Sequence, residues 1–120
     1  MRSTLAREDD MLDELPPVVS RYFQADGKRD VDAILALFTP DATVLDEGET
    51  YRGINRLRAW QDGPASRWEY TVTILGARPL ADGRLRVGGR LDGNFPRGTA
   101  TLNFDFELAD EQIRALAIAP

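Results

Sequence analysis

Hydrophobic positions in the first half of the chain repeat with the period of an α-helix. Two stripes predict helices over residues 15–23 and 31–38, and they consist of Leu15, Val18, Val19, Tyr22 and Phe23 and of Val31, Ile34, Leu35 and Phe38. Pro16-Pro17 suits the start of the first helix, because proline is tolerated where the backbone N–H has no helical partner. Asp30 is a suitable N-cap for the second. A third helix is predicted over residues 54–60.

The segment between the second and third helices predicts a short hairpin. Thr39-Pro40-Asp41 is expected to end the helix, since proline disfavours helical geometry in the residue before it. Residues 42–46 then form a strand, Glu47-Gly48-Glu49 a turn, and residues 50–52 a returning strand. Asp46 is thereby placed near the end of a short strand between two helices.

The second half of the chain changes to a period of two. Apolar and polar residues alternate over residues 68–74, 85–95 and 100–108, and a last strand covers 113–118. Turn residues separate these segments, which predicts an antiparallel sheet with one buried face. Helices first and strands afterwards predict an α+β fold with three helices on one face of the sheet.

Length and composition indicate one globular domain. The 120 residues are divided into a tail or leading helix over residues 1–14 and a single domain over 15–120. The net charge of −5 argues against nucleic acid as a partner. No apolar run approaches the ~20 residues of a membrane span, and the first residues lack the apolar core of a secretory signal. The absence of cysteine suits a cytoplasmic protein.

The chain contains no histidine, which restricts its possible chemistry. Catalytic triads with histidine and zinc sites built on histidine or cysteine are excluded. Acid–base chemistry would then fall to Asp, Glu, Tyr or Lys. No spaced set of oxygen ligands suggests a metal site, and no cofactor is expected.

The order of these elements, with their residues, resembles the nuclear transport factor 2-like superfamily. The resemblance covers residues 15–118 and is carried by Arg21-Tyr22, Phe38 with Pro40-Asp41-Ala42-Thr43-Val44, Asp46-Glu47-Gly48, Tyr51-Arg52-Gly53, Trp60 and residues 104–113. This superfamily includes ketosteroid isomerases and SnoaL-like polyketide cyclases, and the chain is most similar to its SnoaL-like branch. The resemblance implies a cystatin-like, cone-shaped sheet wrapped round three helices, and a homodimer.

The resemblance also implies roles for individual residues. Tyr22 and Asp46 fall where steroid isomerases carry an oxyanion-binding tyrosine and a general-base aspartate. The second oxyanion donor of those enzymes falls at Leu102 or Asn103. Glu47-Gly48 stands where the isomerases have proline.

The residues themselves leave two interpretations of each candidate. Asp46 either faces solvent in a turn or lies at the floor of the cone, because alternation does not decide whether Val44 and Asp46 or Thr43 and Leu45 point inward. Tyr22 is either a core aromatic or a hydrogen-bond donor to a substrate oxygen. Glu47 is expected to be solvated.

The remaining candidates are residues expected to line a binding cavity and two rows of mostly charged side chains. The expected substrate-binding residues are Trp60, Trp68, Tyr51, Asn103 and Phe106. Asn103, Asp105 and Glu107 form one row, which is expected to be solvated or to lie in a subunit interface, and Arg84, Arg86 and Arg90 form a comparable row. The alternatives are that the two rows meet across strands or across a dimer and, less favoured, that the arginines form an anion site.

Two functions are compatible with these features of the sequence. One is a cofactor-free isomerase or cyclase acting on a small hydrophobic carbonyl compound, with Asp46 as base. The other is a non-catalytic ligand-binding or dimerisation module.

Overall fold

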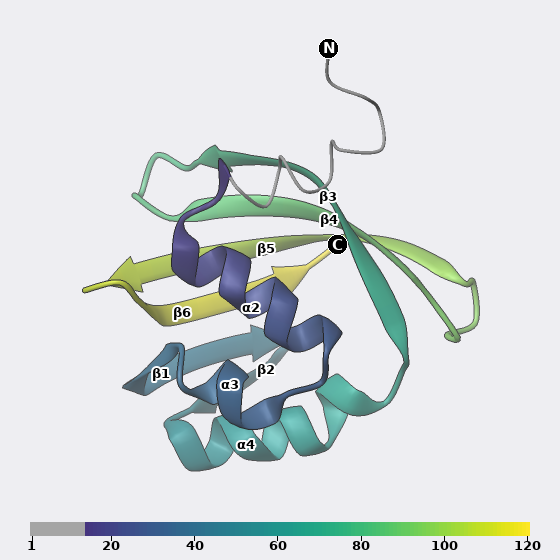
Figure 1. Ribbon diagram of the computed structural model, residues 1–120, viewed down its shortest axis with the longest axis horizontal. Helices are drawn as coiled ribbons and strands as arrows, with labels where there is room; N and C mark the ends of the chain where they lie inside the picture. The colour runs from purple at the N-terminus through teal and green to yellow at the C-terminus, as the bar shows by residue number, and fades with distance from the viewer. Residues whose placement is uncertain (1–13) are drawn as a thin grey trace.

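The computed structural model describes residues 14–120, so the tail or leading helix expected over residues 1–14 lies, except for Glu14, outside the described residues. Within this range the α+β fold is confirmed, with a curved six-stranded sheet and three α-helices (Figure 1). In chain order the elements are α2 (Pro17–Gly27), α3 (Val31–Leu35), β1 (Phe38–Asp46), β2 (Glu49–Arg52), α4 (Ile54–Asp62), η2 (Pro64–Ser66), β3 (Tyr70–Pro79), β4 (Leu85–Gly93), β5 (Thr99–Ala109) and β6 (Gln112–Ala119).

The second and third helices begin at the predicted residues and the first begins at Pro17, two residues after its predicted start, but the second helix ends early. Helix α2 starts directly after Pro16, and the Asp30 side chain caps α3 by accepting a hydrogen bond from the Ala33 backbone N–H at 3.1 Å. Phe38, predicted as the end of the helical stripe, instead opens β1 and pairs with Ile113 of β6. Pro40 lies where the β1–β6 register shifts, a position at which a strand tolerates a missing N–H.

The strand order is β2-β1-β6-β5-β4-β3. All neighbouring strands are antiparallel except β1 and β6, which pair in parallel, so the sheet is mixed rather than wholly antiparallel. Helix α4 and η2 carry the chain from the β1–β2 hairpin to β3 at the opposite edge. The meander β3-β4-β5-β6 then returns and places β6 beside β1.

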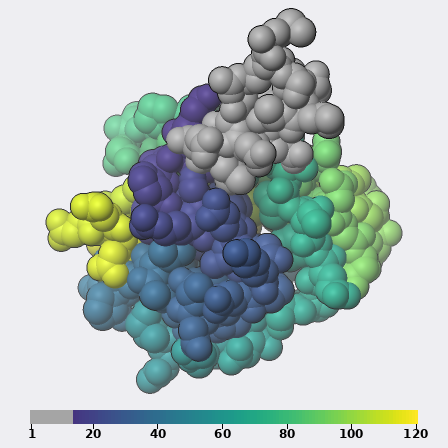
Figure 2. Space-filling model, viewed as in Figure 1, coloured from purple at the N-terminus to yellow at the C-terminus, as the bar shows by residue number. Residues whose placement is uncertain are grey.

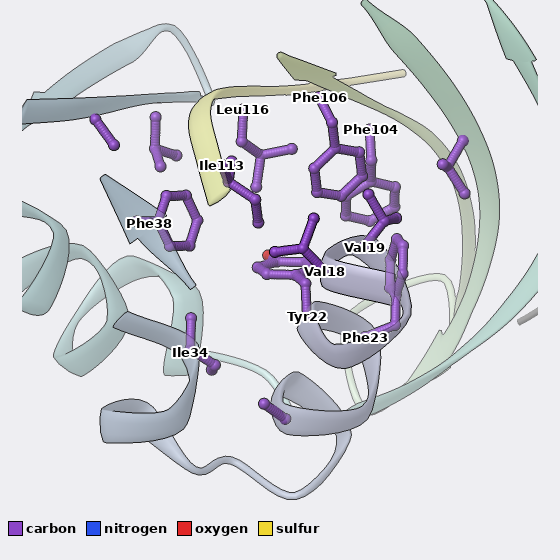
Figure 3. Close-up of a cluster of buried hydrophobic side chains, with 14 of the residues drawn as sticks. Val18, Val19, Tyr22, Phe23, Ile34, Phe38, Phe104, Phe106, Ile113 and Leu116 are labelled. Atoms are coloured by element: carbon purple, nitrogen blue, oxygen red, sulfur yellow. The ribbon is translucent and has the colours of Figure 1, made fainter. Parts of the chain in front are cut away.

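The core lies between α2 and the inner face of the sheet, the face that α2 contacts (Figures 1 and 3). Tyr22 and Phe23 of α2 meet Phe106 edge-to-face, with ring centroids 5.6 and 5.8 Å apart. Figure 2 shows α2 and α3 covering the middle of this side of the molecule. The fold thereby fixes α2 against the sheet, and α2 carries one of the predicted site residues. No helix within residues 14–120 is long and apolar enough to cross a membrane.

Candidate functional site

Strand β1 turns Asp46 toward the inside of the molecule. Ala42 and Val44 are fully buried, whereas Leu45 is 43% exposed. Because side chains of a strand alternate between its two faces, Asp46 lies on the same face as Ala42 and Val44. Of the two orientations left open by the sequence, the structure has the one with Val44 and Asp46 inward.

Asp46 borders a cavity of about 330 Å³ between the sheet, α2 and the α4–β3 connection. Such a volume lies at the lower end of the range of small-molecule sites. Most of the wall is aromatic or aliphatic, and the cavity is lined by Tyr22, Asp26, Asp46, Glu47, Gly48, Trp60, Pro64, Ala65, Trp68, Tyr70, Leu91, Leu102, Phe104, Ile118, Ala119 and Pro120.

The Asp46 carboxylate is held by a tryptophan. Nε1 of Trp60, a buried residue of α4, donates a hydrogen bond to Oδ2 of Asp46 at 3.0 Å. Burial raises the pKa of Asp46 above its usual value and the charge of Glu47 adds to this effect, while the Trp60 hydrogen bond opposes it. The result is an oriented carboxylate that is a stronger base than an exposed aspartate.

Tyr22 brings a hydroxyl group to the same cavity. Tyr22 is only 3% exposed, and its ring packs among Val18, Val19 and the core aromatic residues (Figure 3). The Tyr22 hydroxyl makes no hydrogen bond within residues 14–120. In that range only one side-chain polar atom, Nε2 of Gln61, is both fully enclosed and without a hydrogen bond, so the Tyr22 hydroxyl oxygen is not fully enclosed. The hydroxyl oxygen therefore keeps accessible surface, which opens to the cavity.

The electrostatics keep this hydroxyl protonated. Burial is the main cause that raises the pKa of Tyr22 well above its usual value, and the nearby Asp26 and Asp46 charges raise it further. Tyr22 is thus a hydrogen-bond donor at neutral pH.

A second carboxylate at the cavity, Asp26, is more deeply buried than the half-buried Asp46 and is absent from the candidate site residues of the sequence. It is 6% exposed and accepts hydrogen bonds from the Tyr70 hydroxyl at 3.2 Å and from Nη1 of Arg29 at 2.8 Å. Burial raises the pKa of Asp26, and the Arg29 charge opposes the rise. In the sequence, Asp26-Gly27 indicates only the end of a helix. The spacing of four from Tyr22, which places both residues on one helix face, is the available signal.

Arg29 is itself anchored by α4. Its Nη2 donates to Oε1 of Gln61 at 3.0 Å and to the Gln61 backbone carbonyl at 3.3 Å. Gln61 is fully buried and does not line the cavity. The Arg29–Gln61 contact therefore ties α4 to the end of α2 behind the cavity wall.

The structure divides the predicted substrate-binding residues into two groups. Trp60 and Trp68 line the cavity, whereas Tyr51, Phe106 and Asn103 do not. Tyr51 packs beside Trp60, with ring centroids 6.4 Å apart, and Phe106 is fully buried in the core.

Asn103 lies on the outer face of the sheet, in a groove with Arg78 and Arg86, because it alternates with the inward residues Leu102 and Phe104. Leu102 is thus the residue at the cavity, and it supplies no second oxyanion donor.

Two other expectations concern charges. Of the alternatives for the charged rows, the structure has a contact across strands for Arg86, whose Nε and Nη2 donate to the Asp105 carboxylate at 2.8 and 2.9 Å. Glu47, expected to be solvated, is exposed at the cavity rim and lies 3.6 Å from Arg67. In the described part of the chain, no group of three or more acidic side chains is arranged to hold a metal ion.

Comparisons with known proteins identify the family and the fold. Residues 19–113 match the family model of the SnoaL-like domain. A proposed polyketide cyclase from Sinorhizobium meliloti has a similar structure, with 31% sequence identity and a TM-score of 0.82, over 90% of this chain and 98% of the other.

More distant structures share the fold. A Catenulispora acidiphila protein with a ketosteroid isomerase-like fold, solved with trimethylamine, is 19% identical at a TM-score of 0.75, over 88% of this chain and 85% of the other. A Mycobacterium tuberculosis protein in complex with estradiol-17β-hemisuccinate is 15% identical at a TM-score of 0.71, over 86% of this chain and 90% of the other. No curated protein sequence matches the chain.

Proposed function

Because the chain belongs to the SnoaL-like domain family, we propose that it is a small-molecule-binding protein that acts as a cofactor-independent isomerase or cyclase on a hydrophobic carbonyl compound. The observation that carries the proposal is the shared position of Asp46 and Tyr22 at one largely apolar cavity. A base and a hydrogen-bond donor facing one space are the groups needed to form an enolate.

In the proposed reaction, the Asp46 carboxylate removes a proton from the carbon next to the substrate carbonyl. The electron pair of that C–H bond moves into the new C=C bond, and the carbonyl oxygen becomes an enolate oxygen. The Tyr22 hydroxyl donates a hydrogen bond to this oxygen. Return of the proton to another carbon completes an isomerisation, whereas attack of the enolate carbon on an electrophile in the same molecule closes a ring.

The surroundings support these roles. The Trp60 hydrogen bond fixes one carboxylate oxygen of Asp46, which leaves the other for the proton. Tyr70 is engaged with Asp26, so Tyr22 is the hydroxyl with free bonding capacity. With Leu102 in place of a second donor, stabilisation of the enolate depends mainly on Tyr22.

A small β,γ-unsaturated ketone tests the proposal. Cyclohex-3-en-1-one becomes the conjugated cyclohex-2-en-1-one on isomerisation, and ultraviolet absorbance follows the change. Asp46→Asn preserves an acceptor for Trp60 but removes the base, so turnover should fall about 10²-fold or more. Tyr22→Phe should also reduce turnover. The control is Asp41→Asn, which changes an exposed carboxylate of the same strand and should leave the rate unchanged.

The alternative is a ligand-binding module without catalysis. The observation in its favour is the same Trp60–Asp46 hydrogen bond, which gives Asp46 a structural task. Wild-type protein that converts the ketone no faster than Asp46→Asn, while still binding small molecules in the cavity, would support this alternative.

A further inference from the structure

The cavity combines aromatic walls with charges of one sign. Among residues 14–120, the charged side chains that line the cavity are all carboxylates, those of Asp26, Asp46 and Glu47, and no lysine or arginine of this range lines it. Five aromatic side chains complete the wall, those of Tyr22, Trp60, Trp68, Tyr70 and Phe104. Aromatic ring faces carry negative electrostatic potential and attract cations, as carboxylates do.

One of these carboxylates, Asp46, forms no ion pair with a described residue. Arg29 pairs with Asp26 at 2.8 Å, and Arg67 lies 3.6 Å from Glu47 at the rim. Asp46 forms no ion pair within residues 14–120, and its side-chain hydrogen-bond donor is the neutral indole of Trp60. The charge of Arg67 acts on Asp46 only from beyond ion-pair distance, and Arg67 is already the partner of Glu47. The cavity therefore carries an excess negative charge next to an aromatic ring.

The field of two carboxylates reaches the unbonded polar group of the wall. Both Asp26 and Asp46 raise the pKa of the Tyr22 hydroxyl, so this buried hydroxyl lies within the influence of each. It faces the cavity and makes no hydrogen bond within the described residues. A ligand with an acceptor atom for Tyr22 and a positive charge for the surrounding negative potential would complement both features of the wall.

We propose that the cavity binds small molecules that carry a cationic amine, held against the aromatic walls in the field of Asp46 and Asp26, together with an oxygen that accepts from Tyr22. This inference rests on the proposal that the cavity is the ligand site, and it narrows the substrate class to amine-bearing carbonyl compounds. A cationic nitrogen also withdraws electrons from the neighbouring carbon, which makes its C–H bond easier for Asp46 to deprotonate.

The chain provides its own reporter for a test. It contains two tryptophans, and both line the cavity, so intrinsic fluorescence responds to ligands at this site. The probes are choline and 3,3-dimethylbutan-1-ol, which share shape and hydroxyl group and differ in the charge of the central atom. Titrations at constant ionic strength should give choline a dissociation constant about tenfold lower than that of the alcohol.

Variants assign the preference to the carboxylates. Asp46→Asn should reduce the choline preference to less than about threefold while leaving the affinity for the alcohol unchanged, and Asp26→Asn should also reduce it because Arg29 then loses its counter-charge. Asp41→Asn should keep the full preference. Equal affinities for the two probes, no response to choline, or a preference that persists in both cavity variants would overturn the inference.

Binding of choline is measured separately from catalysis. The titration reports equilibrium binding and requires no turnover, whereas the cyclohexenone assay uses an uncharged substrate. A choline preference without ketone isomerisation would contradict the catalytic proposal alone, and isomerisation without the preference would contradict the amine inference alone.

Discussion

At the scale of the residue, Asp46 shows what the sequence can and cannot predict. The resemblance to steroid isomerases around Ala42-Thr43-Val44 makes Asp46 a candidate base. Its direction is undetermined in the sequence, because Val44 and Leu45 are equally apolar and alternate on opposite faces. Packing decides the matter: Val44 is enclosed by the core, while Leu45 remains 43% exposed on the outer face.

The pKa of Asp46 predicts how its replacement alters stability with pH. The pKa of Asp46 is higher in the native state than in the unfolded state. At a pH between these two pKa values, native Asp46 is still protonated and unfolded Asp46 is already ionised. Ionised Asp46 therefore reduces the stability of the wild type at neutral pH. At pH 7 the Asp46→Asn variant should unfold at the same temperature as the wild type or at a higher one. This difference in unfolding temperature should shrink as the pH falls below the usual pKa of aspartate. A variant clearly less stable than wild type at pH 7 would contradict the stated electrostatics.

Asp105 is the matched opposite case. The Arg86 hydrogen bonds lower the pKa of Asp105 in the folded protein. Ionised Asp105 therefore stabilises the fold at a pH above the usual pKa of aspartate, and this stabilisation is lost as the pH falls through the lowered pKa. Asp105→Asn should lower the free energy of unfolding by about 1 kcal/mol at pH 7. Chemical denaturation at pH 7 and at acidic pH should show that this penalty fades in acid. A penalty that is independent of pH would rule out the ion pair as its origin.

At the scale of the element, the turns and most strands are predictable from the sequence, and the boundary at Phe38 is not. Phe38 continues the helical stripe of Ile34 and Leu35, so periodicity alone extends the helix. The structure ends α3 at Leu35 because Phe38 pairs with Ile113, which lies far along the chain. Local pattern carries no information about such a distant partner, and the same limit conceals the contact between Asp26 and Tyr70.

Two strand glycines should respond differently to an added methyl group. A Cβ at Gly93 would lie 2.3 Å from the Glu69 backbone oxygen, whereas one at Gly76 would meet nothing within 4 Å. Gly93→Ala should therefore destabilise the protein by about 1–3 kcal/mol. Gly76→Ala should be neutral or stabilising by less than about 1 kcal/mol, because alanine restricts the unfolded chain. Thermal unfolding of the two variants should show this contrast, and equal effects would contradict the close approach at Gly93.

At the scale of the whole molecule, the sequence predicts the architecture but not the strand order or the cavity. The parallel β1–β6 pair joins strands that are far apart in the chain, which periodicity cannot reveal. The cavity depends on how far Trp68, Leu102 and Phe104 fill the space above Asp46, and residue types do not specify that filling.

The outer face of the sheet leads us to predict a homodimer. It carries the two large hydrophobic residues that are exposed within residues 14–120, Leu45 at 43% and Leu75 at 47%. A curved sheet with helices on one side leaves the opposite face available for a second copy. Light scattering should give about twice the 13.4 kDa of one chain, and Leu75→Glu should shift the protein toward the monomer. Gln24→Glu on the exposed side of α2 is the control, and a wild-type monomer at micromolar concentration would contradict the prediction.

In the proposed reaction, Asp46 removes a proton from the carbon next to a carbonyl group inside this cavity. Deuterium incorporation into cyclohex-3-en-1-one in D₂O, followed by proton NMR, measures that step without requiring a completed isomerisation. We predict enzyme-dependent incorporation at the carbon between the carbonyl and the double bond, reduced about 10²-fold or more in Asp46→Asn and unchanged in Asp41→Asn. Incorporation that proceeds equally in the wild type and Asp46→Asn, or no faster than in buffer, would contradict the claim.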